Sequence, residues 1–207
     1  MVYVKVVGLT GGIGTGKTEV AGILRELGAQ ILSADHLAHE TYLPGTTGWE
    51  KIVEEFGRQV LAPGGEIDRK ALGAMVFQDA ARLGRLNAIV HPLTRELIAL
   101  RLRRLSDEDC RVAVVEVALL VEAIRMDVAW TALIDEVWVV VAPEDLVVER
   151  AVSRGGLDAE AVRARVHAQA TQDERREIAD VIIENDGRLE LLRNRVEGLW
   201  QERLATN

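Results

Sequence analysis

A glycine-rich segment near the amino terminus limits the fold of this chain more than any other feature. Gly11, Gly16, Lys17 and Thr18 fill the pattern Gly-x-x-x-x-Gly-Lys-Thr of a phosphate-binding loop. Glycines allow positive φ angles and bring several backbone N–H groups onto one phosphate. The lysine of such a loop reaches the β- and γ-phosphates, and the threonine hydroxyl can ligate Mg²⁺. The segment therefore predicts a site for the phosphates of a nucleotide.

The residues on both sides of this loop predict the strand and the helix that the motif requires. Residues 2–9 form an apolar, β-branched run, and apolar residues follow the loop at helical spacing. Gly28 stands where a helix commonly ends. The helix adds its N-terminal dipole and its free N–H groups to the phosphate site. This context disfavours the alternative, a plain glycine turn between a strand and a helix.

Composition excludes several classes of protein. A net charge of −8 disfavours a general nucleic-acid binder, which carries a basic surface. The 207 residues contain no apolar run long enough for a membrane span and no signal-peptide pattern. The single cysteine, Cys110, excludes an internal disulfide and a multi-cysteine metal site. We expect a cytoplasmic protein without nucleic-acid or membrane partners, and the sequence leaves the oligomeric state open.

Strand and helix patterns alternate along the chain. Further short apolar runs, of the kind found in parallel sheets, lie at residues 29–32, 112–117, 136–141 and 181–184. The helical patterns between them predict an α/β fold with a parallel five-stranded sheet. In such folds a nucleotide lies at the carboxyl ends of the strands.

We expect one domain, residues 1–207, with three parts. The nucleotide-binding core is predicted to comprise residues 1–35, 110–142 and 177–207. Residues 36–109 show helical patterns without strands, which predicts a helical insertion that binds the second substrate, and residues 143–176 are predicted to form a helical lid. Within the insertion, Gly57 and Asp68 mark a helix end and a helix cap, and Pro92 predicts a break before a new helix at 93–105.

The motif by itself permits kinases, GTPases and larger ATPases. The Asn-Lys-x-Asp and Asp-x-x-Gly strings of GTPases do not occur. The dinucleotide-binding pattern Gly-x-Gly-x-x-Gly is also broken, because the residue three positions after Gly14 is Lys17 and not glycine. A small-molecule kinase fits best, because the insertion gives a second substrate its own pocket. Another P-loop kinase, for nucleoside monophosphates or a small hydroxylated metabolite, and a non-catalytic nucleotide-binding module remain as alternatives.

An arginine-rich arm supports a kinase. Residues 150–176 contain six arginines and no lysine. Arg150 and Arg154 are i,i+4 neighbours on one helix face, and we assign both to phosphate contacts, because guanidinium groups pair well with phosphate oxygens. For Arg163 and Arg176 we favour ion pairs on a solvated helix face.

The chain resembles dephospho-CoA kinases over nearly its whole length. The residues that carry the resemblance are 9–18, 33–35, 67–72, 76–77, 86–93, 117–122, 179–185 and Gln169. Ser33, Ala118 and Gly155 depart from the residues usual in that family, which are aspartate, proline and aspartate. The resemblance implies a three-layer P-loop kinase fold and the phosphorylation, by MgATP, of the ribose 3′-hydroxyl of dephospho-CoA, the last step of coenzyme A biosynthesis.

The motif and the resemblance together imply a set of site residues. The loop residues that bind ATP are Gly12, Gly14, Thr15, Gly16, Lys17 and Thr18, with Thr18 also a ligand of Mg²⁺. Asp35 is expected to accept the proton of the 3′-hydroxyl, with capping of the next helix as the alternative.

Weaker expectations concern four other positions. His39, Arg69 and His91 are expected near the acceptor substrate, and Asn185 near the adenine end of the nucleotide. For Arg69 a surface role is an equal alternative, and for His91 packing or capping is favoured slightly.

Overall fold

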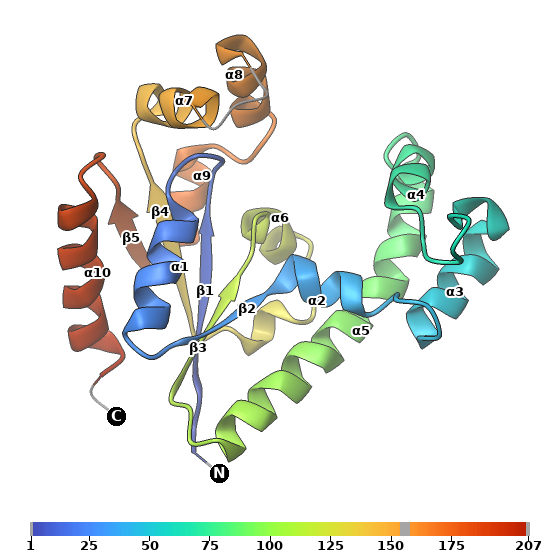
Figure 1. Cartoon of the computed structure of the whole chain (residues 1–207), viewed down its shortest axis with the longest axis horizontal. Helices are drawn as coiled ribbons and strands as arrows, with labels where there is room; N and C mark the ends of the chain where they lie inside the picture. Colours follow the sequence, from blue (N-terminus) through green and yellow to red (C-terminus); the bar gives the residue numbers. More distant parts are fainter. Residues whose placement is uncertain (1, 154–157, 206–207) are drawn as a thin grey trace. The chain divides into compact units, whose positions relative to one another are not determined.

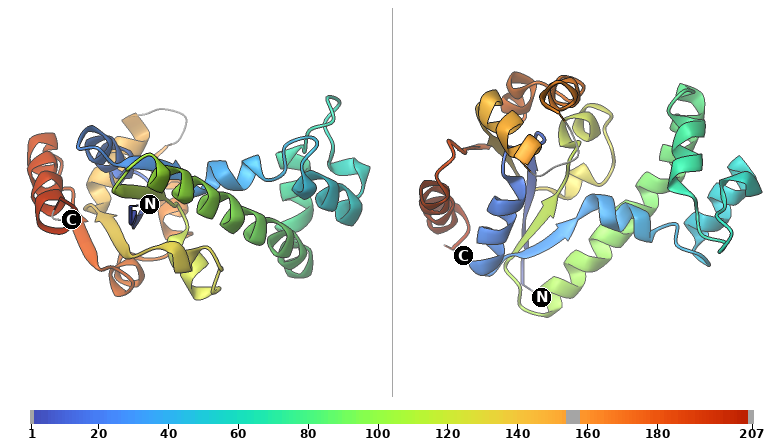
Figure 2. Two further views of the ribbon diagram at one scale, coloured as in Figure 1. Left: turned by 90° about the horizontal axis from the view of Figure 1, so that it is seen from below. Right: turned by 45° about the horizontal axis from the view of Figure 1, so that its top comes forward.

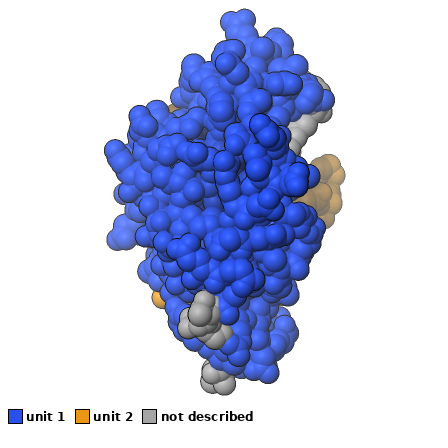
Figure 3. Space-filling model, turned by 90° about the vertical axis from the view of Figure 1, so that its left-hand side faces the viewer, with its two compact units in different colours: residues 1–33, 102–207 blue, residues 34–101 orange. Residues whose placement is uncertain are grey.

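The computed structural model describes residues 2–153 and 158–205 (Figure 1). Contacts between Cα atoms divide the chain into two compact units, which Figure 3 colours separately. Unit 1 comprises Met1–Ser33 and Leu102–Asn207, and unit 2 comprises Ala34–Arg101. Among the described residues, no helix is both long and apolar enough to cross a membrane.

Unit 1 is built on a five-stranded sheet in the order β2-β3-β1-β4-β5. All neighbouring strands pair in parallel, so the predicted α/β fold with a parallel sheet is confirmed. The strands are β1 (Lys5–Gly11), β2 (Gln30–Ser33), β3 (Val112–Glu116), β4 (Glu136–Val141) and β5 (Val181–Glu184). After β1 the chain continues to β2 at one edge of the sheet, and after β3 it continues to β4 on the opposite side of β1. The carboxyl ends of β1 and β3 therefore flank a topological switch point, where ligands of such sheets bind.

Two helices, α1 (Lys17–Glu26) and α10 (Leu189–Arg203), pack together in unit 1 (Figures 1 and 2). Their apolar faces join the sheet in one core that includes Leu24, Val196 and the fully buried Trp138. Burying one large apolar side chain stabilises a fold by about 1.5–3 kcal/mol. This core therefore fixes the position at which α1 begins, directly after the glycine-rich loop.

The other helices of unit 1 follow β3 and β4. They are α6 (Leu120–Arg125), α7 (Glu144–Ser153), α8 (Ala159–His167) and α9 (Gln172–Glu177), with a 3₁₀ turn at Thr131–Leu133. The sequence patterns did not predict α9, a short helix with a charged sequence. Thr171 and Glu174 begin it with a reciprocal capping box, in which each side chain accepts the backbone N–H of the other residue.

Unit 2 is helical. It contains α2 (Ala34–Glu40), α3 (Thr47–Phe56), a 3₁₀ turn at Arg58–Val60, α4 (Arg69–Val76) and most of α5 (Ala80–Asp107). Gly57 ends α3 with a φ of 79°, and the Asp68 side chain caps α4, as predicted. The core of the unit consists of Ile52, Phe56, Val60, Ile67, Leu72 and Val76.

The predicted helix break at Pro92 is wrong, because α5 continues through it. A proline inside a helix removes one backbone hydrogen bond and strains the preceding turn. Apolar residues before the proline, including Leu86 and Ile89, pack on the core of unit 2, and Ile98 after it is 1% exposed. Packing on both sides of the proline outweighs its local cost.

Candidate active site

The glycine-rich loop connects β1 to α1 in a conformation that needs glycine. Gly14 and Gly16 have φ angles of 72° and 94°, in the left-handed region. Gly16 is constrained a second time, because a Cβ atom there would lie 2.2 Å from Nδ2 of Asn185. Thr15 is 5% exposed, and its hydroxyl donates to the carbonyl of Gly12 at 2.9 Å. The loop is thus held from within and by Asn185, the residue after β5.

A cavity of about 240 Å³ opens over this loop. It brings together five of the six predicted ATP-binding loop residues, while Thr15 is buried and does not line it. The lining residues are Gly11, Gly12, Ile13, Gly14, Gly16, Lys17, Thr18, Glu19, Ala118 and Gln169. Backbone N–H groups at the start of α1 and the Lys17 ammonium make this a cavity for anions.

Glu116 holds the side chain of Lys17 beside the cavity. The Lys17 Nζ lies 2.5 Å from Oε1 of Glu116, and both side chains are about four-fifths buried, with 19% and 22% exposed. The partners meet because β3 and β1 are neighbours and Glu116 is in register with Leu9. Glu116 thus has the lysine of the glycine-rich loop as its partner.

Asn185 and Arg150 contact the loop from the other side. Asn185 is 5% exposed, and its Nδ2 donates to the carbonyl of Thr15 at 2.9 Å. Its Oδ1 accepts Nη2 of Arg150 at 3.2 Å, and Nη1 of Arg150 lies 3.5 Å from the carbonyl of Gly14. Together with Gly16, Arg150 and Asn185 line a second cavity of about 260 Å³. Arg154 falls outside the described residues.

Asp35 lies in unit 2, in the first turn of α2 and two residues after β2 ends. Its side chain is exposed, and it follows the first helical residue, Ala34, so it does not occupy the N-cap position. Ser33, the last residue of β2, is in register with Glu116 of β3. The chain therefore enters α2 directly from the carboxyl edge of the sheet.

The other predicted acceptor residues also belong to unit 2. His39 is half-buried with its ring edge against Tyr42, and its Nδ1 has no hydrogen-bond partner among the described residues. Arg69 is exposed at the start of α4. His91 is half-buried in α5, and burial lowers the pKa of its imidazole. Burial also raises the pKa of the Tyr42 hydroxyl, which the charge of Arg69 partly opposes.

The sequence did not identify two residues beside the phosphate cavity, Gln169 and Arg175, as functional. Gln169 belongs to the resemblance without an assigned role, yet it lines the phosphate cavity. Arg175 lies in a run of charged residues, which predicts a solvated face, yet it is 6% exposed and packs on Gly12. Arg163 and Arg176 do form ion pairs, with Glu144 at 2.9 Å and Glu184 at 3.6 Å.

A strand, a glycine-rich loop and a helix, with a lysine at the switch point of a parallel sheet, define the P-loop nucleotide-binding proteins. Comparison with known proteins narrows this class. The family model described as Dephospho-CoA kinase matches residues 5–190. A dephospho-CoA kinase of Geobacter sulfurreducens is 42% identical over 198 residues, which cover 96% of this chain and 98% of that protein.

Solved structures agree with this match. The crystal structure of TT1252 from Thermus thermophilus is 34% identical and has a TM-score of 0.80, covering 97% of this chain and 98% of that one. The dephospho-CoA kinase from Campylobacter jejuni is 30% identical with a TM-score of 0.69, covering 96% of each chain. The chain belongs to the dephospho-CoA kinase family. The predictions of a kinase and of a P-loop kinase fold are thereby confirmed.

Proposed function

We propose that this chain transfers the γ-phosphoryl group of ATP to the ribose 3′-hydroxyl of dephospho-CoA and releases CoA and ADP. The observation that carries the proposal is the anion cavity over the glycine-rich loop in a chain that matches the dephospho-CoA kinase family over residues 5–190. The cavity supports the donor half of the reaction. The family supports the identity of the acceptor.

The nucleotide phosphates lie on residues 12–18 in this proposal. Backbone N–H groups of the loop and the start of α1 bind the α- and β-phosphates. Lys17 exchanges its contact with Glu116 for oxygens of the β- and γ-phosphates, whose charge exceeds that of one carboxylate. Asn185 lies behind the loop beside the second cavity, which is a suitable place for the adenine end.

The residues of the cavity fit a Mg²⁺ ion. Thr18 is exposed at the cavity, Glu19 lines it, and Glu116 is paired with Lys17 beside it, so the available donors are hard oxygens. Among the described residues, no group of three or more His, Cys, Asp or Glu side chains forms a dedicated metal cage. A cation held by one hydroxyl, phosphate oxygens and water matches the preference of Mg²⁺. The ion would neutralise phosphate charge during transfer.

Asp35 is the proposed general base. A carboxylate is too weak a base to deprotonate a ribose hydroxyl in the ground state. It can accept the proton late, because the transition state of phosphoryl transfer is loose and the nucleophile commits late. The position of Asp35 directly after β2 supports this role, since β2 lies in the same parallel sheet as β1.

The remaining site residues complete the proposal. We assign His39, Arg69 and His91 to contacts with the acceptor, within a helical insertion at residues 36–109. Residues 143–176 act as the lid, and Arg150 and Arg154 stabilise the transferred phosphoryl group. Arg150 already lies beside the loop through its contact with Gly14.

The direct test measures ADP release with MgATP and dephospho-CoA, with AMP, CMP and shikimate as competing acceptors. We expect turnover with dephospho-CoA to exceed that with the other three. Asp35→Asn should lower kcat by about 10²–10⁴-fold with the fold intact, the usual contribution of general-base catalysis. Asp107→Asn, at an exposed position at the end of α5, is the matched control. Inertness toward dephospho-CoA would refute the substrate, and near-normal kcat in Asp35→Asn would refute the base.

A further inference from the structure

Gln169 presents unused hydrogen-bond donors to the phosphate cavity. Its Oε1 accepts two bonds, from the backbone N–H of Ile13 at 3.1 Å and from Nη2 of Arg175 at 3.3 Å. Both neighbours are donors, which fixes the amide orientation with Oε1 toward them. The Nε2 group therefore carries two N–H donors, and no acceptor among the described residues bonds to it. Because the side chain lines the cavity, a ligand there is the natural acceptor.

Arg175 supports this arrangement from behind the loop. It is 6% exposed, and burial lowers the pKa of its guanidinium. A Cβ atom on Gly12 would lie 3.3, 3.5 and 3.6 Å from Nη1, Cζ and Nη2. These similar distances show that the planar guanidinium faces the position of a Cβ atom at Gly12, so a side chain there would require Arg175 to shift by a few tenths of an ångström.

The buried charge of Arg175 is poorly compensated by the protein. Among the described residues, no carboxylate forms an ion pair with it within 4.0 Å, and Glu122 and Glu174 act only from a distance. A buried cation without a close partner is costly. The hydrogen bond from Nη2 of Arg175 directs Oε1 of Gln169 toward this charge.

The segment that carries Gln169 is fixed by contacts of its neighbours. The backbone N–H of Ala170 donates to Oε1 of Glu122 at 3.4 Å, and Nε2 of Gln172 donates to the carbonyl of Ala142 at 2.9 Å. Glu174 forms an ion pair with Arg125 at 2.7 Å and a capping box with Thr171. Gln169 is thus held by α6 and by the end of β4, as preorganised catalysis requires.

We infer that Gln169 is a phosphate-binding residue, whose Nε2 donates to an oxygen of the γ-phosphate, and that Arg175 is a positioning residue that acts through Oε1 of Gln169. This inference rests on the proposed binding of ATP to the loop. The γ-phosphate is assigned because backbone N–H groups of such a loop take the α- and β-phosphates. Thr18 is assigned to Mg²⁺, so Lys17 and Gln169 are the side-chain donors lining the cavity that remain for the terminal phosphate.

The variant Gln169→Glu separates this role from a structural one. Its carboxylate still accepts the bonds from Ile13 and Arg175, so the melting temperature should be unchanged or higher. The second oxygen replaces the donor and repels phosphate. We expect kcat to fall by about 10²–10³-fold, the usual loss for one preorganised donor. The Kd of a non-hydrolysable ATP analogue with Mg²⁺ should rise at least about tenfold, and that of ADP by less than about threefold.

Gln30→Glu is the matched control, with the same charge change at the start of β2. Gln30 is exposed and lies at the amino end of its strand, whereas the loop lies at the carboxyl ends, so the kcat of this variant should stay within about threefold of the parent. An equal loss in both variants would show that charge alone explains the effect. Unchanged kcat in Gln169→Glu would make Gln169 purely structural, and equal losses of ADP and ATP-analogue affinity would exclude the γ-phosphate.

A double-mutant cycle tests Arg175. If Arg175 acts through Gln169, Arg175→Met should lower kcat by about tenfold alone and add nothing in the Gln169→Leu background. Additive losses would refute the positioning role. The nucleotide titrations need no acceptor, so they still test Gln169 if dephospho-CoA proves not to be the substrate. An inert parent enzyme would refute the proposed function and leave the titrations valid.

Discussion

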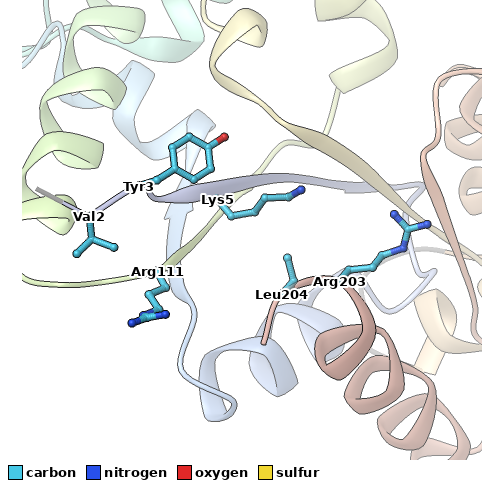
Figure 4. Close-up of a pocket in the computed structure, with 6 residues that line it drawn as sticks. All are labelled: Val2, Tyr3, Lys5, Arg111, Arg203 and Leu204. Atoms are coloured by element: carbon cyan, nitrogen blue, oxygen red, sulfur yellow. The ribbon is translucent and has the colours of Figure 1, made fainter. Parts of the chain in front are cut away.

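The two ends of the parallel sheet each carry a basic cavity, and they differ in how their charges are used. At the carboxyl end the cavity over the glycine-rich loop measures about 240 Å³. At the amino end a larger cavity of about 360 Å³ is lined by Val2, Tyr3, Lys5, Arg111, Arg203 and Leu204 (Figure 4). Volume alone would select the amino end as the functional site.

At the amino end, Lys5 and Arg203 are already paired with a carboxylate. Glu136 lies 2.9 Å from Nζ of Lys5 and 3.4 Å from Nη1 of Arg203, and it accepts Nε1 of Trp138 at 3.0 Å. Burial opposes ionisation of Glu136, but the bonds from Trp138 and Lys5 lower its pKa below the ordinary value. Asp135 likewise accepts the N–H of Val6 at 2.7 Å.

At the carboxyl end, some hydrogen-bond donors have no bonded acceptor among the described residues. Lys17 is paired with Glu116, as Lys5 is with Glu136, but among the described residues the Nε2 group of Gln169 has no bonded acceptor and Arg175 lacks a close counter-charge. An anion gains more where donors are unused than where carboxylates already occupy them. The comparison shows that unsatisfied donors identify the functional end of this sheet better than cavity size does.

The largest expected effect comes from the lysine of the carboxyl end. Lys17→Met removes the charge that faces the β- and γ-phosphates and should cost about 3–4 kcal/mol of transition-state stabilisation, or roughly 10²–10³-fold in kcat/KM. A steady-state assay of ADP release measures this loss, and the melting temperature verifies the fold. Turnover at the parental rate would show that the lysine at the carboxyl end does not serve phosphoryl transfer.

A smaller effect is expected from the loop backbone. Gly16→Ala combines a left-handed φ of 94° with a Cβ atom 2.2 Å from Nδ2 of Asn185. Such strain costs about 1–3 kcal/mol, so the Kd for ADP should rise by about 10–100-fold. Gly28→Ala is the control, because its φ is 112° but no atom lies within 4 Å of the added Cβ. It should lower stability and leave the ADP Kd unchanged; equal ADP binding by both variants would contradict the predicted loop geometry.

The glycine-rich loop and the residues that contact it differ in how far the sequence predicted them. The loop from Gly11 to Thr18 was predictable because its strand, turn and helix are adjacent in sequence and each follows local rules. Residues brought together by the sheet were harder. Lys17 and Glu116 are 99 positions apart in the chain, and they pair because β3 lies beside β1 in the sheet.

Burial against the local pattern accounts for the remaining errors. Arg175 stands among charged residues, and nothing in that run indicates that one guanidinium packs under the loop while its neighbour Arg176 is exposed. The same holds for Pro92, where helix-breaking propensity is local and the packing that overrides it is not. The roles of Asp35, His39, Arg69 and His91 stay predictions.

Acid pH should weaken the segment that carries Gln169. The bond from Arg125, with those from Thr171, lowers the pKa of Glu174 from 4.5 to about 2. A depressed folded-state pKa contributes stability that is present above the unfolded-state pKa and is lost as pH falls toward the folded value. Glu174→Gln keeps a capping-box residue but loses the charge. Denaturant unfolding should show the parent more stable at pH 7, with the difference vanishing from about pH 5 to pH 2; a pH-independent difference would contradict this.

The smallest effect is expected at the amino end. Lys5→Met leaves Glu136 with its bonds to Arg203 and Trp138, so no buried charge loses every partner. A partly exposed pair of this kind contributes about 0–1 kcal/mol, and the free energy of unfolding should change by no more than that. Because the amino end lies across the sheet from the loop, kcat should stay within about twofold of the parent, in contrast to Lys17→Met. A tenfold loss of kcat in Lys5→Met would mean that cations at the amino end also serve the reaction, and the distinction between the two ends would fail.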